Sequence, residues 1–147
     1  MGTHSYPVWI AAPPERVYDL YTDLDRIGEW QEGNPRITDL SGDPRRAGST
    51  YMTRRGRFAS RSEVMVAERP TKHVVRIDGP KGLRAEITSQ FAPEEQGTQL
   101  TIGLDARWGS PLLGRVVEWA IFNRRTARRE LGKLKAIAEQ EDRDKAP

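Results

Sequence analysis

The chain has 147 residues, with 24 Lys and Arg against 21 Asp and Glu and a formal net charge of +3, a balance too mixed to indicate a nucleic-acid partner. It contains no cysteine, which excludes disulfides, thiolate nucleophiles and cysteine-ligated metal centres. Its two histidines, His4 and His73, form no zinc-binding motif, so we expect no metal and no cofactor.

Length and hydropathy predict one domain outside the membrane. We expect a single domain over residues 1–147 with an ordered core at about residues 5–141, because a chain of this size can bury a sizeable core. No apolar run approaches 18 residues, and the N-terminus lacks a signal-peptide pattern. The sequence therefore predicts a cytoplasmic protein without membrane insertion.

The first part of the chain predicts a strand followed by two short helices. An apolar strand at residues 5–10 ends before Pro13 and Pro14, which stop a strand and can open a helix. Apolar residues spaced three and four apart predict helices at 15–24 and 25–31. A Gly-Asn-Pro turn follows the second helix.

Between residues 36 and 108 the apolar period changes to two, which predicts six consecutive antiparallel strands. Apolar and polar residues alternate clearly at 83–91 and 100–108, so we expect one apolar and one solvated sheet face. The alternation is ambiguous at 48–68. There we expect the inward residues to be Tyr51, Thr53, Val64 and Val66.

A long amphipathic helix is predicted at residues 111–141, with Ser110 as its N-cap and Pro111 in its first turn. Its apolar stripe consists of Val116, Ala120, Ala127, Leu131, Leu134 and Ala138, with Asn123 among them. The residues in the first half of the stripe are small. They leave a space between helix and sheet unless a bulky strand residue fills it.

The order of several short motifs is similar to that of a known superfamily. These motifs are VWI followed by APPERVYDLYTD, Trp30 before the Gly33-Asn34-Pro35 turn, Gly48 opening a strand with Tyr51, VAERPTKHVVRI, and GTQLTI before a basic, Leu-rich last helix. They resemble the START-like or Bet v 1-like helix-grip superfamily (SRPBCC), in particular its bacterial polyketide cyclase/dehydrase and lipid-transport branch. The resemblance covers about residues 6–140.

This resemblance implies an α+β helix-grip fold. A seven-stranded curved antiparallel sheet would wrap around the long C-terminal helix, with two short helices between strands 1 and 2. It also implies a hydrophobic cavity between sheet and helix. It does not imply one activity, because members include lipid, quinone and steroid binders as well as aromatase/cyclases.

The residues themselves also predict a cavity, because a curved apolar sheet has more area than small helix residues can cover. Trp30 either forms a wall or lid at the mouth of this cavity or packs in the core. Arg124 either reaches an anionic group of the ligand or lies along the protein surface. The expected ligand-binding residues are Trp30, Tyr51, Thr53, Val64, Val75, Ile87, Ser89, Phe91, Ile102, Leu104, Val116, Ala120, Asn123 and Arg124.

These residues favour binding of a hydrophobic or aromatic small molecule of polyketide, lipid or isoprenoid type. The alternative is a polyketide cyclase or dehydratase acting in the same cavity, with Tyr51 as proton donor or Glu63 as base. Glu63 would point inward only if its strand were shifted in register by one residue. His73, at the start of a strand, is expected to be exposed.

A third interpretation is a protein or RNA contact module that uses two groups of basic residues. Acidic neighbours on the last helix favour an ordinary solvated face instead, and we expect no nucleic-acid partner. Trp119 and Phe122 lie off the apolar stripe and suit either a homodimer contact or packing under the short helices. The basic residues are Arg54, Arg55, Arg57, Arg61, Arg124, Arg125, Arg128 and Arg129.

Overall fold

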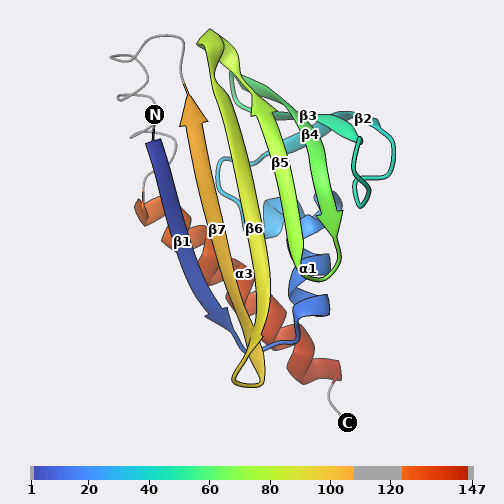
Figure 1. Ribbon diagram of the computed structural model, residues 1–147, viewed down its shortest axis with the longest axis vertical. Coiled ribbons are helices and arrows are strands. Elements are labelled where there is room, and N and C mark those ends of the chain that lie inside the picture. Colours follow the sequence, from blue (N-terminus) through green and yellow to red (C-terminus); the bar gives the residue numbers. More distant parts are fainter. Residues whose placement is uncertain (1, 108–123, 146–147) are drawn as a thin grey trace.

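A seven-stranded antiparallel sheet carries its helices on one face in the computed structural model, which describes residues 2–107 and 124–145 (Figure 1). The strand order is β1-β7-β6-β5-β4-β3-β2, and two 3-10 helices are labelled η1 and η2. In chain order the elements are β1 (Gly2–Ile10), α1 (Pro14–Thr22), η1 (Leu24–Glu29), β2 (Arg36–Ser41), β3 (Thr50–Arg55), β4 (Phe58–Glu68), β5 (Lys72–Asp78), η2 (Pro80–Gly82), β6 (Arg84–Glu94), β7 (Gly97–Arg107) and α3 (Arg124–Lys145).

This architecture confirms the helix-grip fold expected from the sequence. The curved sheet lies in front of the long helix α3, and α1 lies behind the lower part of the sheet (Figure 1). The second of the two short helices, η1, is a 3-10 helix rather than an α-helix. Both short helices lie between β1 and β2 in the chain, as predicted.

Part of the predicted last helix lies outside the described residues. Within the described part, α3 continues the apolar stripe, and its buried residues are Leu131, Leu134 and Ala138. Several sequence predictions cannot be placed for this reason. The residues concerned are Ser110, Pro111, Val116, Trp119, Ala120, Phe122 and Asn123.

The alternation expected in the last two strands is confirmed. Ala85 and Phe91 of β6, and Leu100, Leu104 and Ala106 of β7, are all buried. Because successive side chains of a strand point to opposite faces, these residues form one continuous apolar face. That face is turned toward the helices and supplies one wall of the candidate site.

A β-bulge in β4 changes which residues face the helices. Val64 pairs with Val75 of β5, but beyond the bulge Ala67, rather than Val66, pairs with His73. Directly opposed residues of an antiparallel pair share a face. The expectation that Val66 points inward is therefore wrong, because one extra residue in the strand reverses the alternation at this point.

The main hydrophobic core lies at the end of the sheet where the β6–β7 turn is found. It joins α1 and α3 to the ends of three strands, and its buried members are Ile10, Ala12, Val17, Tyr18, Leu20, Trp30, Phe91, Leu100, Leu131, Leu134 and Ala138. A second, smaller cluster lies toward the other end of β6 and β7. It consists of Leu83, Ala85, Leu104 and Ala106.

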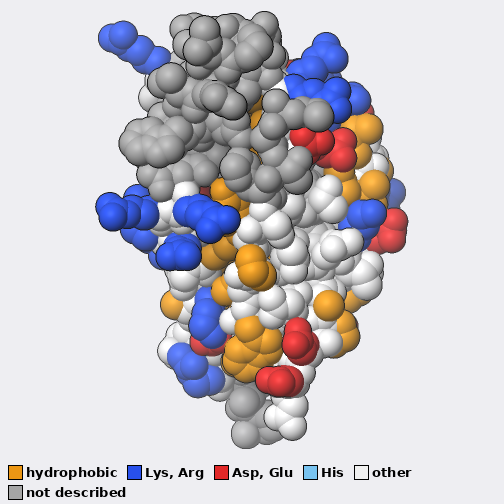
Figure 2. All heavy atoms as spheres, turned by 60° about the vertical axis from the view of Figure 1, so that its left-hand side comes forward, with side chains coloured by type: hydrophobic (Ala, Val, Ile, Leu, Met, Phe, Trp, Pro, Cys, Tyr) orange, Lys and Arg blue, Asp and Glu red, His pale blue; other side chains and the backbone are white. Residues whose placement is uncertain are grey.

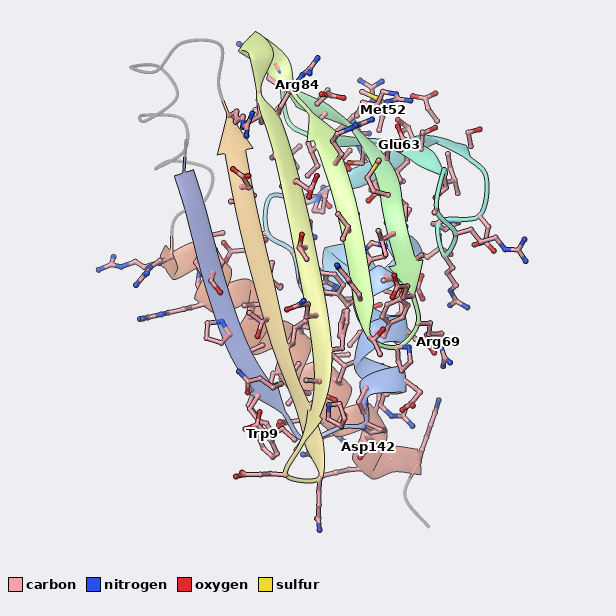
Figure 3. All side chains as sticks on the ribbon, in the orientation of Figure 1. Trp9, Met52, Glu63, Arg69, Arg84 and Asp142 are labelled. Carbon is pink, nitrogen blue, oxygen red and sulfur yellow. The ribbon has the colours of Figure 1, made fainter. Side chains whose placement is uncertain are left out.

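Ion pairs hold α3 against the segment that contains α1 and η1. Exposed pairs of this kind stabilise a fold by less than about 1 kcal/mol each, so their main contribution is to fix where the helix lies. Asp142, near the end of α3, is one of the partners (Figure 3). The pairs are Arg16 with Asp142 at 3.1 Å, Arg26 with Glu141 at 2.5 Å, and Arg129 with Glu32 at 2.8 Å.

Candidate ligand-binding site

A cavity of about 430 Å³ lies between the helix-facing side of the sheet and the first described turns of α3. We refer to it as the larger cavity. It extends from Leu131 of the main core to Leu104 of the second cluster. Its apolar walls are formed by Tyr6, Phe58, Ile87, Ile102, Leu104, Ala127 and Leu131.

A smaller space of about 150 Å³, which we call the recess, adjoins the larger cavity. It lies between η1 and strands β3 to β5 and has a more polar lining. His73 of β5 contributes an imidazole to this lining. Hydroxyl groups come from Tyr21, Thr22, Tyr51, Thr53, Ser60 and Ser62.

One set of side chains, which we call the shared wall, lines both spaces: Tyr21, Trp30, Gln31, Arg55 and Ile87. The rings of Tyr21 and Trp30 are stacked, with centroids 5.4 Å apart and an interplanar angle of 24°. Arg55 donates a hydrogen bond from Nη2 to the side-chain oxygen of Gln31. Burial raises the pKa of Tyr21 to about 12, so its hydroxyl remains protonated at neutral pH.

Three polar nitrogens around the recess have no hydrogen-bond partner among the described residues. They are Trp30 Nε1, Arg55 Nε and His73 Nε2. Each belongs to a side chain that lines the recess. Buried polar groups in proteins are nearly always hydrogen-bonded, so three unpartnered nitrogens on neighbouring side chains are an exception to that rule.

His73 is buried between the sheet and the helices, beside two tyrosine rings. Its side chain is only 7% exposed, and its ring centroid lies 6.1 Å from that of Tyr18 and 6.3 Å from that of Tyr21. Burial lowers its pKa to about 4, so the imidazole is neutral at pH 7. The expectation of an exposed His73 is wrong, since alternation along β5 turns this side chain toward the helices.

Two carboxylates lie at the edge of the larger cavity. Glu130 of α3 accepts a hydrogen bond from the backbone N–H of Glu32 at 2.8 Å, and burial raises the pKa of its carboxyl group. Glu32 in turn accepts two hydrogen bonds from Arg129, at 2.8 and 3.0 Å. The rim of the larger cavity is therefore polar and linked to α3.

Most of the binding residues predicted from the sequence line one of the two spaces. Ser89 and Phe91 instead lie in the packed core, where the Ser89 hydroxyl donates to the Tyr21 hydroxyl at 2.7 Å. Arg124 is exposed and lines neither space. Those that do line a space are Trp30, Tyr51, Thr53, Val64, Val75, Ile87, Ile102 and Leu104.

Glu63 does not reach either space. It follows the inward residue Ser62 on β4 and so lies on the opposite face of the sheet (Figure 3). Its carboxylate accepts a hydrogen bond from Arg76 at 3.4 Å and lies 4.0 Å from Arg61. The shift in register that would have turned it inward is not present, so Glu63 is not placed to act as a base in the cavity.

Sequence reasoning missed several residues of the site, chiefly Tyr21, Arg55 and His73. A signal for Arg55 was present, because the alternation that turns Tyr51 and Thr53 inward puts Arg55 on the same face. Its position beside a Gly turn and other arginines suggested a solvated residue instead. Tyr21 belongs to the apolar stripe of α1 and could have been assigned to the wall on that ground.

The arginines of α3 are mainly exposed, and Arg129 pairs with Glu32. In the view of Figure 2, Lys and Arg side chains project from the surface, and Asp and Glu side chains lie on the same face. In the part of the chain that the structure describes, no group of His, Asp or Glu is arranged to hold a metal ion. No described helix has the length and apolar character needed to cross a membrane.

The sequence matches the model of a known protein family. A family model described as polyketide cyclase / dehydrase and lipid transport matches residues 1–139. A comparison with curated proteins gave no match.

Solved structures with the same fold are numerous. Protein MLL2253 from Mesorhizobium loti is 19% identical with a TM-score of 0.72, and the match covers 96% of this chain and 99% of that one. The Aha1 dimer from Colwellia psychrerythraea is 20% identical with a TM-score of 0.65, covering 95% and 97%. A norcoclaurine synthase point mutant from Thalictrum flavum, in complex with a transition-state analogue, is 11% identical with a TM-score of 0.73, covering 95% of both chains.

At these identities the structural likeness shows the fold alone. The family model, however, extends over nearly the whole length of the sequence. Together with the helix-grip architecture, this match establishes that the chain belongs to the SRPBCC-type polyketide cyclase/dehydrase and lipid transport family.

Proposed function

We propose that this protein binds a hydrophobic or aromatic small molecule, of polyketide, lipid or isoprenoid type, in the larger cavity. The observation that carries the proposal is a space of about 430 Å³ whose walls are mainly apolar. Ligand sites typically have volumes of about 300–1,000 Å³ and combine apolar walls with a few polar groups. The larger cavity and the recess together have this character.

The binding energy would come mainly from removing apolar surface from water, at about 25 cal/mol per Å². Ile102, Leu104 and Leu131 offer such surface from two strands and from α3. The charged residues that line this cavity, Glu32, Glu130 and Arg55, already interact with other groups of the chain. An uncharged, largely apolar ligand therefore fits the larger cavity best.

Filling the larger cavity should weaken binding. Ala127 lines it from α3, and Ala127→Trp places an indole in the space a ligand would use. We expect this variant to bind the neutral fluorescent probe N-phenyl-1-naphthylamine at least about tenfold more weakly than the wild type, a loss of about 1.4 kcal/mol. Fluorescence titration measures the affinity.

Ala136→Trp is the matched control, since Ala136 lies on the same helix but is exposed. It should bind the probe as the wild type does. Equal affinity in the Ala127→Trp variant and the control would contradict binding in the larger cavity. Separately, mass spectrometry of small molecules released from the denatured wild-type protein would identify the natural ligand class.

A second candidate function is a polyketide cyclase or dehydratase. It is supported by the position of Tyr51 and His73 on the same recess, one a hydroxyl donor and the other a neutral base. Burial raises the pKa of Tyr51, so its hydroxyl is protonated and able to donate at neutral pH. Such a pair offers one hydrogen-bond donor and one acceptor to a bound carbonyl compound.

The Tyr51→Phe variant separates the two functions. For a binding protein, the variant should retain its affinity for the co-purified ligand within about threefold. For an enzyme, it should also bind, but conversion of that ligand should fall by about 100-fold or more, because the proton donor is lost. Liquid chromatography of the ligand after incubation with each protein gives the result, and unchanged conversion would remove Tyr51 from the mechanism.

The homodimer and the cytoplasmic location stay predictions. The first is proposed from Trp119 and Phe122, and one solved structure of the same fold is described as a dimer. Sedimentation of the purified protein tests it directly.

A further inference from the structure

Two buried N–H groups of the shared wall can only donate hydrogen bonds. Trp30 Nε1 and Arg55 Nε have no partner among the described residues. An indole and a guanidinium contain no acceptor, so neither group can be satisfied by another donor. Each therefore requires an oxygen acceptor that the described chain does not supply.

The two donors come from different elements but line the same boundary. Trp30 is 4% exposed, is held by stacking on Tyr21, and follows η1. Arg55 ends β3 and is oriented by its hydrogen bond to Gln31. Their positions are therefore fixed by packing and hydrogen bonding before any ligand enters.

The recess beyond these donors suits a small uncharged group. Its volume of about 150 Å³ is too small for a ring system of several fused rings but large enough for a carbonyl group and its neighbours. Among the described residues that line it, only Arg55 carries a charge at neutral pH. Glu130 already lies close enough to interact with that charge, so a ligand carboxylate would meet a carboxylate nearby.

On the basis of the proposed function, we propose that the recess receives a carbonyl oxygen of the ligand, to which Trp30 and Arg55 donate hydrogen bonds. The apolar body of the ligand occupies the larger cavity. The ligand class is thus an aryl ketone or quinone rather than a simple hydrocarbon or a fatty acid. His73 Nε2, also unpartnered on this recess, is available to a second polar atom of such a ligand.

A pair of probes that differ in one oxygen tests this assignment. Fluorene and 9-fluorenone have the same ring skeleton, and only fluorenone has a carbonyl group. Both affinities are measured by displacement of N-phenyl-1-naphthylamine from the wild type, from Trp30→Phe and from Arg55→Met. The ratio of the two affinities cancels the apolar contribution that the probes share.

We expect each substitution to lower the preference for fluorenone over fluorene by about fivefold, the effect of one hydrogen bond. The infrared carbonyl stretch of bound fluorenone should lie at lower wavenumber in the wild type than in either variant. Ala136→Val is the control, because Ala136 is exposed on α3 and lines neither space. It should leave both affinities, their ratio and the carbonyl stretch unchanged.

The outcomes separate this inference from the proposed function. If both probes bind but the ratio and the carbonyl stretch are the same in all four proteins, water satisfies the donors and the carbonyl assignment is overturned. If neither probe binds the wild type, the proposed function fails together with the inference. Circular dichroism of each variant shows whether the fold is retained, and the conservative Trp30→Phe keeps the ring stack on Tyr21.

Discussion

Replacing Leu134 with alanine is expected to lower the free energy of unfolding by about 3–4 kcal/mol. Leu134 is completely buried in the main core, between α3 and the residues of α1 and the sheet. Removing its isobutyl group loses apolar burial and leaves a void that close-packed neighbours fill only in part. Urea unfolding followed by circular dichroism measures the change.

Leu131→Ala, one turn earlier on the same face of α3, is the informative comparison. Leu131 already borders the larger cavity on one side, so its truncation removes fewer contacts and should destabilise the fold by about 2 kcal/mol. It should also enlarge the cavity and admit bulkier probes. If Leu134→Ala were no more destabilising than Leu131→Ala, the packing described for the main core would be incorrect.

Acid should destabilise the protein through His73. The pKa of this imidazole is about 4 in the folded protein, against an ordinary value of 6.5. Between these two values the unfolded chain binds a proton that the folded chain does not bind. The stability that is present above pH 6.5 is therefore lost as the pH falls toward 4, by about 3 kcal/mol in total.

The His73→Phe variant isolates this contribution. Between pH 7 and pH 4.5 both proteins lose unfolding free energy. The wild type should lose about 2–3 kcal/mol more than the variant. Carboxylates such as Glu29 and Glu141, whose pKa values are lowered by Arg26, titrate in both proteins and cancel in the comparison. The rings of Tyr18 and Tyr21 face the imidazole and are uncharged in this range. An equal loss of stability in the two proteins would contradict a buried, neutral His73.

The sequence was sufficient to predict the fold, because the relevant signals are local and repeated. Strict alternation in β6 and β7 fixes which face is buried, and helical spacing identifies α1 and α3. These patterns involve many residues each, so a single exception does not obscure them. The motif order then agreed with a known family, and the family model confirms that assignment.

The site was harder to predict, because it depends on single residues at irregular positions. The bulge in β4 reverses the alternation within one strand, and no turn residue marks it in the sequence. Arg55 and His73 are polar residues next to turns, where exposure is the usual outcome, yet the register of β3 and β5 turns both inward. Only the pairing of strands with their neighbours, which is a non-local property, determines these orientations.

The extra residue in β4 has a further consequence for related proteins. It places the methyl group of Ala67, instead of the isopropyl group of Val66, opposite the imidazole of His73. Room for that ring depends on how many residues the strand contains as well as on their identity. A homologue with a one-residue deletion here would be expected to place a larger side chain opposite this histidine and so to leave less room beside the imidazole.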